Sequence, residues 1–191
     1  MKKKMLLTLA VLALAMGQAT AQRVLPKMHG IAIGGGLVDG KCDSFYGGMT
    51  MDSYTNGGNK WAFGVEYLQR NHQYEHGENG KQNIPVSQFT AESGYYKQVL
   101  SDASKSFLAY FGASALAGYE TVNWNDKQLD DGSRLTGKDG IVYGCAATLS
   151  VEWYLSDKVV LTGNVRERFL WGNTYGHSHA QYGIGLKFII N

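Results

Sequence analysis

The stretch of sequence that most constrains the fold is the segment 180–191, where apolar side chains alternate with polar or small ones. Ile189 is the one break in this alternation. A period of two residues is that of a β-strand, so the segment predicts a strand with one apolar face. Because the sequence stops just after it, we expect that face to be covered from outside the chain, or to lie on the outside of a closed sheet. The predicted apolar face consists of Tyr182, Ile184, Leu186, Phe188 and Ile190.

Two kinds of protein contain such a strand. One is a bacterial outer-membrane barrel, in which a terminal strand with an aromatic residue near its end faces lipid and closes the barrel against the first strand. The other is a soluble sandwich or lipocalin-like barrel, in which this would be the last strand of a water-soluble sheet. The segment alone is compatible with both.

Residues 1–21 have the features of a secretory signal peptide. Lysines at 2–4 precede an apolar run over 5–16, and Ala-Thr-Ala at 19–21 supplies the small residues of a cleavage site. The run is shorter than the ~20 residues that a membrane-spanning helix needs, so we expect cleavage rather than a retained anchor. We therefore predict an exported protein with a single mature domain, 22–191.

The charge of the mature chain limits its possible partners. The sequence holds 18 basic and 16 acidic residues, and loss of the three lysines of the signal peptide leaves 15 basic residues. A chain without a basic excess lacks an electrostatic stripe for DNA, so we expect no direct nucleic-acid binding. Cys42 and Cys145 could pair in an oxidising compartment, but the alternating pattern around Cys145 favours a small apolar side chain over a disulfide.

The periodicity of the rest of the chain predicts an all-β fold. Glycine and aromatic residues are abundant, proline occurs only twice, and no helical period is long enough to compete with the alternating segments. An even number of strands suits a single-chain antiparallel up-and-down barrel, and we predict eight. The predicted strands are 30–38, 45–54, 60–70, 85–99, 106–124, 141–155, 159–171 and 180–190.

The two faces of the predicted strands distinguish a membrane barrel from a soluble one. In the strand 141–155, one row is bulky and apolar with aromatic residues near its ends, whereas the other holds mainly small residues and one charge, Glu152. The narrow interior of an eight-stranded barrel accommodates small residues and paired ions, whereas bulky rows with aromatic ends are typical of lipid-facing walls. The sequence thus predicts an eight-stranded antiparallel outer-membrane-type β-barrel.

The lengths of the connections favour the same interpretation. If the chain starts in the periplasm, the links on that side, 55–59, 101–105 and 156–158, are all short. The external links 71–84 and 125–140 are long and polar, as in outer-membrane barrels. The other two external links, which are shorter, are 39–44 and 172–179.

Two features do not fit a uniform lipid-facing wall. Glu167 lies in the outward row of the seventh predicted strand, where a carboxylate facing lipid would cost a few kcal/mol near mid-depth and less at the interface. The second predicted strand is only weakly apolar on either face. Each feature could mark a β-bulge, or a face that a partner protein covers.

The inward rows predict an ion-paired lumen. Four acidic and four basic residues fall on these rows. Ions in a narrow lumen are tolerated only when paired, because removing one partner leaves the other charge buried at a cost of roughly 3–5 kcal/mol. We therefore expect a closed, rigid core rather than a wide pore. The predicted interior charges are Glu66, Arg70, Glu92, Glu120, Glu152, Arg166, Arg168 and Lys187.

Candidate catalytic or metal-binding residues are few. The histidines form two pairs, His72 with His76 and His177 with His179, both in predicted external loops. No third ligand is apparent beside either pair, so we interpret them as solvated loop histidines. Ser178 has histidine neighbours, but adjacent residues on a strand point to opposite faces, which argues against a nucleophile and base. We expect no enzymatic activity and no cofactor.

Six segments spread along the chain carry specific sequence as well as composition: AQRVLPKM (21–28), GGNKWAFGVEYL (57–68), IPVSQFTAESGYY (84–96), SALAGYETVNW (114–124), RERFLWG (166–172) and GHSHAQYGIGLKFIIN (176–191). They resemble the TraO family of conjugal transfer proteins, which conjugative transposons of Bacteroides-type bacteria encode. The resemblance implies a component of the mating apparatus that carries DNA between cells, acting at the cell envelope. It implies no particular functional residues.

Together, the rows and the resemblance predict a non-enzymatic outer-membrane barrel that serves as a structural or docking element of a conjugation apparatus. Its expected partners are outer-membrane lipid and other apparatus proteins. An interior filled with side chains cannot pass DNA, so we do not expect this chain alone to be the conduit. The alternatives are a soluble periplasmic barrel that binds a small apolar ligand or a machine subunit, and a surface enzyme that modifies lipid. The sequence does not indicate an oligomeric state.

Overall fold

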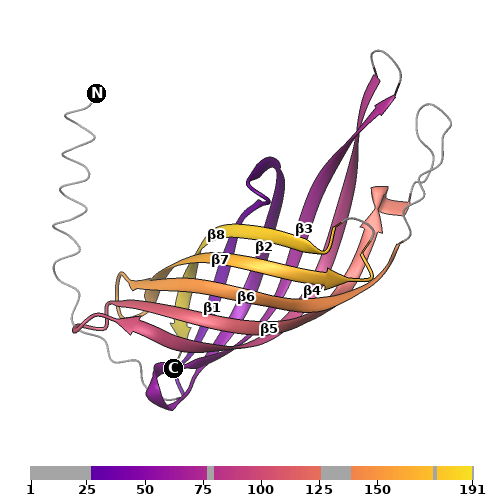
Figure 1. The fold of residues 1–191 in the computed structure, drawn as a ribbon. Coiled ribbons are helices and arrows are strands. Elements are labelled where there is room, and N and C mark those ends of the chain that lie inside the picture. Colours follow the sequence, from indigo (N-terminus) through magenta and orange to yellow (C-terminus); the bar gives the residue numbers. More distant parts are fainter. Residues whose placement is uncertain (1–26, 77–79, 126–138, 174–175, 191) are drawn as a thin grey trace, which may run out of the picture.

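The computed structural model describes residues 27–76, 80–125, 139–173 and 176–190, and the predicted signal peptide lies outside these ranges. Eight antiparallel strands pair in sequence order, and the last pairs with the first to close a barrel (Figure 1). The predicted eight-stranded up-and-down barrel is confirmed. The strands are β1 (His29–Val38), β2 (Lys41–Tyr54), β3 (Lys60–His76), β4 (Gly80–Ser101), β5 (Phe107–Val122), β6 (Gly140–Tyr154), β7 (Val159–Trp171) and β8 (Ser178–Ile190).

The two ends of the barrel differ. At one end, which we call the turn end, the short links 55–59, 102–106 and 155–158 join neighbouring strands. In the second of these turns, the Asp102 carboxylate accepts a hydrogen bond from the backbone N–H of Phe107 (3.0 Å), which lowers the pKa of Asp102. At the other end, which we call the ribbon end, β3 and β4 project past the other strands as a two-stranded ribbon (Figure 1).

The prediction of an external loop at 71–84 is wrong, because both strands continue through it. β3 and β4 pair without interruption from Lys60 opposite Tyr96 to His76 opposite Gly80. Strand pairing uses backbone hydrogen bonds, so a polar sequence can extend a hairpin that the barrel has already aligned. His72 and His76 therefore lie on β3 and not in a loop.

The predicted external link 39–44 is also shorter in the structure. β2 begins at Lys41, so only Asp39 and Gly40 connect it to β1. Both have positive φ, 54° and 66°, as a two-residue type I′ turn requires, and Asp-Gly is a preferred sequence for that turn. A shift of register between Leu37 and Val38 accommodates the early start of β2.

Helices contribute little to the described part of the chain. The 3-10 turn η2 (Asn56–Gly58) lies between β2 and β3, and η3 (Asn123–Asn125) follows β5, which ends two residues before its predicted end. Within the described residues, no helix is long and apolar enough to cross a membrane.

Alternation along each strand separates an apolar outer wall from a polar lumen. On β8, the inward Gln181 and Lys187 are buried, whereas the outward side chains of the predicted closing strand are 44–73% exposed. β8 pairs with β1 over ten residue pairs, so this strand closes the barrel. The exposed outward residues of β8 are Tyr182, Ile184, Leu186, Phe188 and Ile190.

Aromatic side chains form two belts on the outer wall. Near the ribbon end, rings on neighbouring strands, and that of Trp124 on η3, lie with centroids 5.0–6.3 Å from the next ring. Near the turn end, the rings of Trp61 and Tyr95 make an edge contact at 5.1 Å. The ribbon-end belt comprises Phe45, Tyr67, Phe89, Trp124, Tyr143 and Trp171, and the turn-end belt comprises Trp61, Tyr95, Phe107, Trp153 and Phe188.

Apolar side chains also fill the two ends of the lumen. Near the turn end, Leu108, Tyr110, Val160 and others form one buried cluster. Near the ribbon end, Leu68 and Leu170 belong to two smaller buried clusters. The polar part of the lumen therefore lies between apolar layers.

Replacing Phe188 with Asp should strongly reduce the amount of folded barrel in membranes. The side chain is 46% exposed in an apolar outward row, where a charge has no compensating partner in lipid. Heat-modifiable migration of the membrane fraction on gels measures the folded barrel. Phe188→Leu, which keeps the row apolar, is the matched control, and equal folded levels for the two variants would refute the assigned facing.

Candidate functional site: the ion-paired lumen

The lumen contains three clusters of ionisable side chains at different heights. The cluster nearest the turn end, called the lysine cluster, consists of Asp52, Lys60, Glu152 and Lys187. The Lys60 ammonium lies 3.0 Å from Asp52 Oδ2 and 2.5 Å from Glu152 Oε1. The Lys187 ammonium lies 2.5 Å from the same Glu152 oxygen and also contacts Asp52. Two cations balance two anions, and all four side chains are at most 7% exposed.

Tyrosines complete the lysine cluster. The Tyr54 hydroxyl donates to Glu152 Oε2 (2.7 Å) and accepts a hydrogen bond from the Lys187 ammonium (3.0 Å). The Lys60 ammonium lies 4.8 Å from the centre of the Tyr110 ring, within range of a cation–π interaction. These contacts supply the additional polar interactions that a buried ion pair needs to offset its desolvation.

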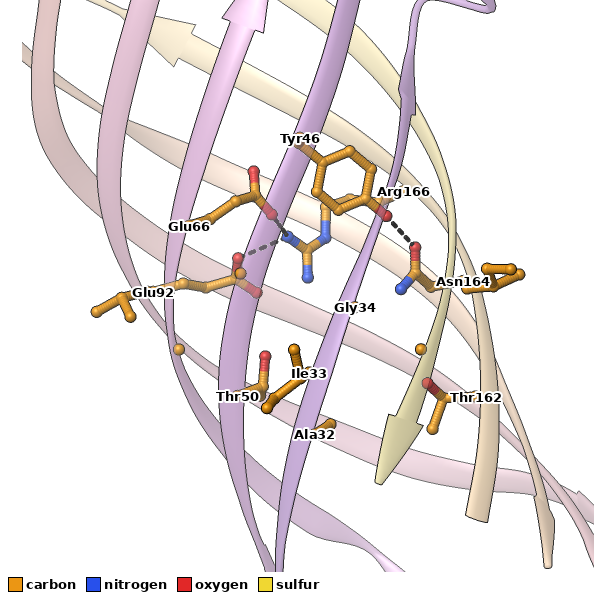
Figure 2. Close-up of a pocket in the computed structure, with 15 residues that line it drawn as sticks. Ala32, Ile33, Gly34, Tyr46, Thr50, Glu66, Glu92, Thr162, Asn164 and Arg166 are labelled. Atoms are coloured by element: carbon orange, nitrogen blue, oxygen red, sulfur yellow. Dashed lines mark hydrogen bonds and ion pairs between the residues drawn. The ribbon is translucent and has the colours of Figure 1, made fainter. Parts of the chain in front are cut away.

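The middle of the lumen holds the arginine cluster, formed by Glu66, Glu92, Arg166 and Arg168. Arg166 lies between the two carboxylates, with Nη1 at 3.2 Å from Glu66 Oε2 and 2.8 Å from Glu92 Oε2 (Figure 2). Arg168 Nη1 lies 2.7 Å from the other Glu66 oxygen, which also accepts a hydrogen bond from the Gln181 amide at 2.7 Å. The cluster thus connects β3 and β4 with β7 and β8 across the lumen.

The third cluster, called the histidine cluster, lies near the ribbon end. Arg70 Nη2 is 3.3 Å from Asp39 Oδ2, and Arg70 Nη1 is 3.0 Å from His179 Nε2. His179 Nδ1 is 3.6 Å from the same Asp39 oxygen. The other oxygen of Asp39 accepts a hydrogen bond from the backbone N–H of Ala180 (3.0 Å). The cluster therefore connects the β1–β2 turn with β3 and β8.

Most of the predicted interior charges contact one another. Glu152 contacts Lys187, and Arg166 contacts both Glu66 and Glu92. Arg168 is 1% exposed and contacts Glu66 from the other side. These contacts join strands that are far apart in the sequence.

Two predicted interior charges have partners outside the predicted set. Arg70 pairs with Asp39 in the first turn. Glu120 is buried and accepts a hydrogen bond from the Gln88 amide at 2.7 Å. The four predicted acids and four predicted bases therefore do not pair only with one another.

The sequence analysis missed Asp52 and Lys60, although their positions could have been inferred. Lys60 begins the even-numbered inward row of β3, and Asp52 continues the inward row of β2 that includes Thr50. Both residues lie within the predicted strands 45–54 and 60–70 but were not counted among the predicted interior charges. They supply half of the charge in the lysine cluster.

The prediction that His179 is a solvated loop histidine is wrong. β8 begins at Ser178, and the inward His179 is only 1% exposed. His177 lies just before β8, with Nδ1 3.0 Å from the carbonyl oxygen of Leu170. The periodicity of β8 extends one residue pair further than the predicted start at 180, which would have placed His179 inside.

Two small polar cavities lie beside the clusters. One, of about 70 Å³, is lined by Tyr46, Asn164 and the carboxylates around Arg166 (Figure 2). The other, of about 80 Å³, reaches from Arg166 to the lysine cluster. Room for the first cavity exists because the inward positions beside it include Gly34 on β1 and Gly185 on β8. A side chain at Gly183, for example, would overlap the Tyr46 hydroxyl. Polar cavities of this size accommodate a few water molecules rather than an apolar ligand.

The charges of the lysine and arginine clusters are compensated within each cluster. Each ion in the lysine and arginine clusters contacts an opposite charge, so neither cluster presents an uncompensated charge to a ligand. Among the described residues, no group of three His, Cys, Asp or Glu side chains is arranged to hold a metal ion. The arrangement fixes the strands relative to one another.

An apolar outer wall with two aromatic belts, closed around a charged and plugged lumen, defines the chain as an outer-membrane-type β-barrel. The sequence matches the family described as conjugative transposon protein TraO over residues 25–190. The chain therefore belongs to the TraO family. No curated protein matches it.

Solved structures support the same fold. The N-terminal β-barrel domain of Pseudomonas aeruginosa OprF is similar with a TM-score of 0.54 at 8% identity, covering 86% of this chain and 98% of that one. Ail, the attachment invasion locus protein of Yersinia pestis, is similar with a TM-score of 0.51 at 9% identity, covering 87% and 100% of the two chains. At these identities the likeness concerns the fold alone.

Glu152→Gln should lower the free energy of unfolding by roughly 3–5 kcal/mol, because it leaves Lys60 and Lys187 buried with a single carboxylate between them. Urea unfolding of the purified protein in lipid vesicles, followed by tryptophan fluorescence, measures the change. Asp43→Asn removes an exposed carboxylate and should change stability by no more than about 0.5 kcal/mol. Equal effects of the two substitutions would contradict the lysine cluster as a stabilising core.

His179 should be the neutral Nδ1–H tautomer at pH 7. A guanidinium group only donates hydrogen bonds, so Nε2 of His179 must accept from Arg70, which leaves the proton on Nδ1 facing Asp39. Nitrogen-15 NMR of histidine-labelled protein distinguishes the tautomers, and His179→Gln identifies the signal by its loss. An Nε2–H tautomer or a doubly protonated ring at pH 7 would contradict the geometry.

Proposed function

We propose that the protein is a non-enzymatic outer-membrane component of a conjugative DNA-transfer apparatus, in which it serves as a structural or docking element. The observation that carries the proposal is the inversion of the barrel: apolar side chains cover the outside, and ion pairs fill the inside. A soluble barrel has the opposite arrangement, with apolar residues inside and charges outside. The family supplies the link to conjugation.

The spacing of the aromatic belts supports a membrane location. On β6, Tyr143 of the ribbon-end belt and Trp153 of the turn-end belt lie ten residues apart. At ~3.3 Å per residue and a strand tilt of ~40°, this separation corresponds to about 25 Å along the barrel axis. The apolar band of outer-membrane barrels has about this height.

The orientation follows from the two ends. Outer-membrane barrels have short periplasmic turns and longer external connections. The turn end, where β1 begins and β8 ends, would then face the periplasm, and the projecting β3–β4 ribbon would face the exterior. In this orientation the ribbon offers an external contact surface, and the turns offer a periplasmic one.

The filled lumen favours a docking or structural role over transport. The three clusters and the apolar end layers occupy the interior, and the cavities beside them are small. A path for DNA or a folded protein would require these ion pairs to separate without replacement partners. We therefore propose contacts with other apparatus proteins and with lipid, without direct nucleic-acid binding.

The mature protein, beginning at Gln22, should sediment with the outer membrane and resist extraction by alkaline carbonate. Both properties follow from a cleaved signal peptide and an apolar outer wall. Cell fractionation with a periplasmic enzyme and a peripheral membrane protein as controls provides the measurement. Recovery in the soluble periplasmic fraction would overturn the proposal in favour of a soluble barrel.

A further inference from the structure

Glu167 is the exception to the apolar outer wall. It lies in the outward row of β7 between Val165 and Phe169, and its carboxylate accepts a hydrogen bond from the Ser178 hydroxyl of β8. The outward Lys97 of β4, by contrast, lies on the turn side of Tyr95 of the turn-end belt. Glu167 is four residues from Trp171, so it lies about 10 Å inside the ribbon-end belt on a strand that rises ~3.3 Å per residue with a ~40° tilt.

The outer wall beside Glu167 is smooth. Ala147 on β6 is the paired neighbour of Glu167, and Ala113 on β5 is the paired neighbour of Ala147. One row nearer the ribbon end, Ala115 on β5 pairs with Cys145 on β6. We call these five residues the Glu167 face. On the opposite part of the wall, on β1 and β2, bulky side chains project outward, with exposures of 49–58% for Ile33, Met49 and Met51.

An apolar groove borders the Glu167 face. It has a volume of about 740 Å³ and runs across the outer wall of β1 to β5. Ala91 and Ala117 contribute to its floor, and Ala117 is the next outward residue after Ala115 on β5. Phe89 and Tyr119 of the same groove are large and stand above this floor. The groove therefore adjoins the Glu167 face on β5, at Ala117, and extends away from it over β4 to β1.

The charge of Glu167 discriminates between possible occupants of the Glu167 face. An acyl chain offers neither a positive charge nor a hydrogen-bond donor to a carboxylate. A second copy related by a two-fold axis would present the same face, which brings a second Glu167 and no cation. A different protein with a Lys or Arg at the same depth would compensate the carboxylate, as paired ions do inside membranes.

The shape of the Glu167 face suits an α-helix. Small residues at membrane interfaces allow backbones to approach closely. An α-helix is ~10 Å wide, which corresponds to about two strand spacings of ~4.8 Å and so to the breadth of the smooth part of β5, β6 and β7. Bulky outward rows would hold such a helix further away.

We propose that the Glu167 face docks a membrane-spanning α-helix of another protein, and that this helix pairs a Lys or Arg side chain with Glu167. The inference rests on the proposed outer-membrane location, because a charge complement at this depth is required only if the surrounding wall faces lipid. It adds to the proposed docking role a specific surface and the chemistry of the partner.

Site-specific photo-crosslinking tests the proposal in cells that carry the complete conjugative element. The photoreactive residue p-benzoylphenylalanine replaces Ala115 on the Glu167 face of the full chain, or Met51 on β2, the strand opposite β6 in the barrel. The Ala115 probe should form a protein adduct whose crosslinked peptide, identified by mass spectrometry, is an apolar segment with a Lys or Arg. The Met51 probe should form lipid adducts. Glu167→Gln, which keeps the size of the side chain, should abolish the protein adduct without lowering the amount of folded barrel.

The other outcomes overturn specific parts of the account. Lipid adducts at both positions would refute the docking surface and leave the membrane location intact, whereas reaction with water at Met51 would refute the membrane location itself. An adduct of two copies would assign the face to self-association. A protein adduct that survives Glu167→Gln, or whose peptide has no basic residue, would refute the charge pairing.

A native thiol provides a second test if the Ala115 probe prevents folding. Cys145 is a free, exposed member of the Glu167 face, and Cys42→Ser leaves it as the single cysteine of the chain. Cys145 should react with a membrane-permeant maleimide in cells that make this protein alone and be protected in cells with the full apparatus. Equal labelling in both would overturn the proposal.

Discussion

The structure depends on pairing ions inside a barrel that is too narrow to hydrate them. Glu152 shares one carboxylate oxygen between Lys60 and Lys187, and Arg166 shares one guanidinium nitrogen between Glu66 and Glu92. Because the partners come from different strands, each cluster holds the barrel together from within, in addition to the backbone ladder on its wall. The side chains of the lumen therefore add connections between strands to those of the backbone ladder that closes the barrel.

The same constraint explains the arrangement of the rest of the molecule. The glycines of β1 and β8 leave room for long side chains from the other strands, and two small polar cavities lie beside the charged clusters. With most charges inside, the outer wall between the aromatic belts is largely apolar, and Glu167 is a charged exception. A rigid, inverted barrel can present its ends and its outer wall to other proteins without changing shape, which is what a docking element of a larger apparatus requires.

Strand periodicity was enough to predict the barrel, its eight strands and the facing of β8, because a period of two and a chain that alternates bulky with small residues leave few alternatives. It did not predict the extended ribbon, where polar residues pair through backbone groups that side-chain patterns do not report. It also missed the Asp39-Gly40 turn, whose signal is a dipeptide rather than a period.

The sequence predicts which charged residues face the lumen but not which of them form ion pairs. Alternation places Glu66, Glu152 and Arg166 inside, but which ions meet depends on the stagger of strands that are distant in the sequence. The pairing of Arg70 with Asp39 and His179 shows this most clearly, since two of these residues were expected in external links. The outward position of Glu167 was predictable, whereas its smooth surroundings became evident only when the strands were paired.

The central claim is that paired ions close the lumen, and electrical recording tests it most directly. The purified, refolded protein, reconstituted into planar lipid bilayers and recorded over a range of voltages, should show no large steady conductance. A stable channel of large conductance in the unmodified protein would contradict the closed lumen and would return this chain to the possible conduits of the transfer apparatus.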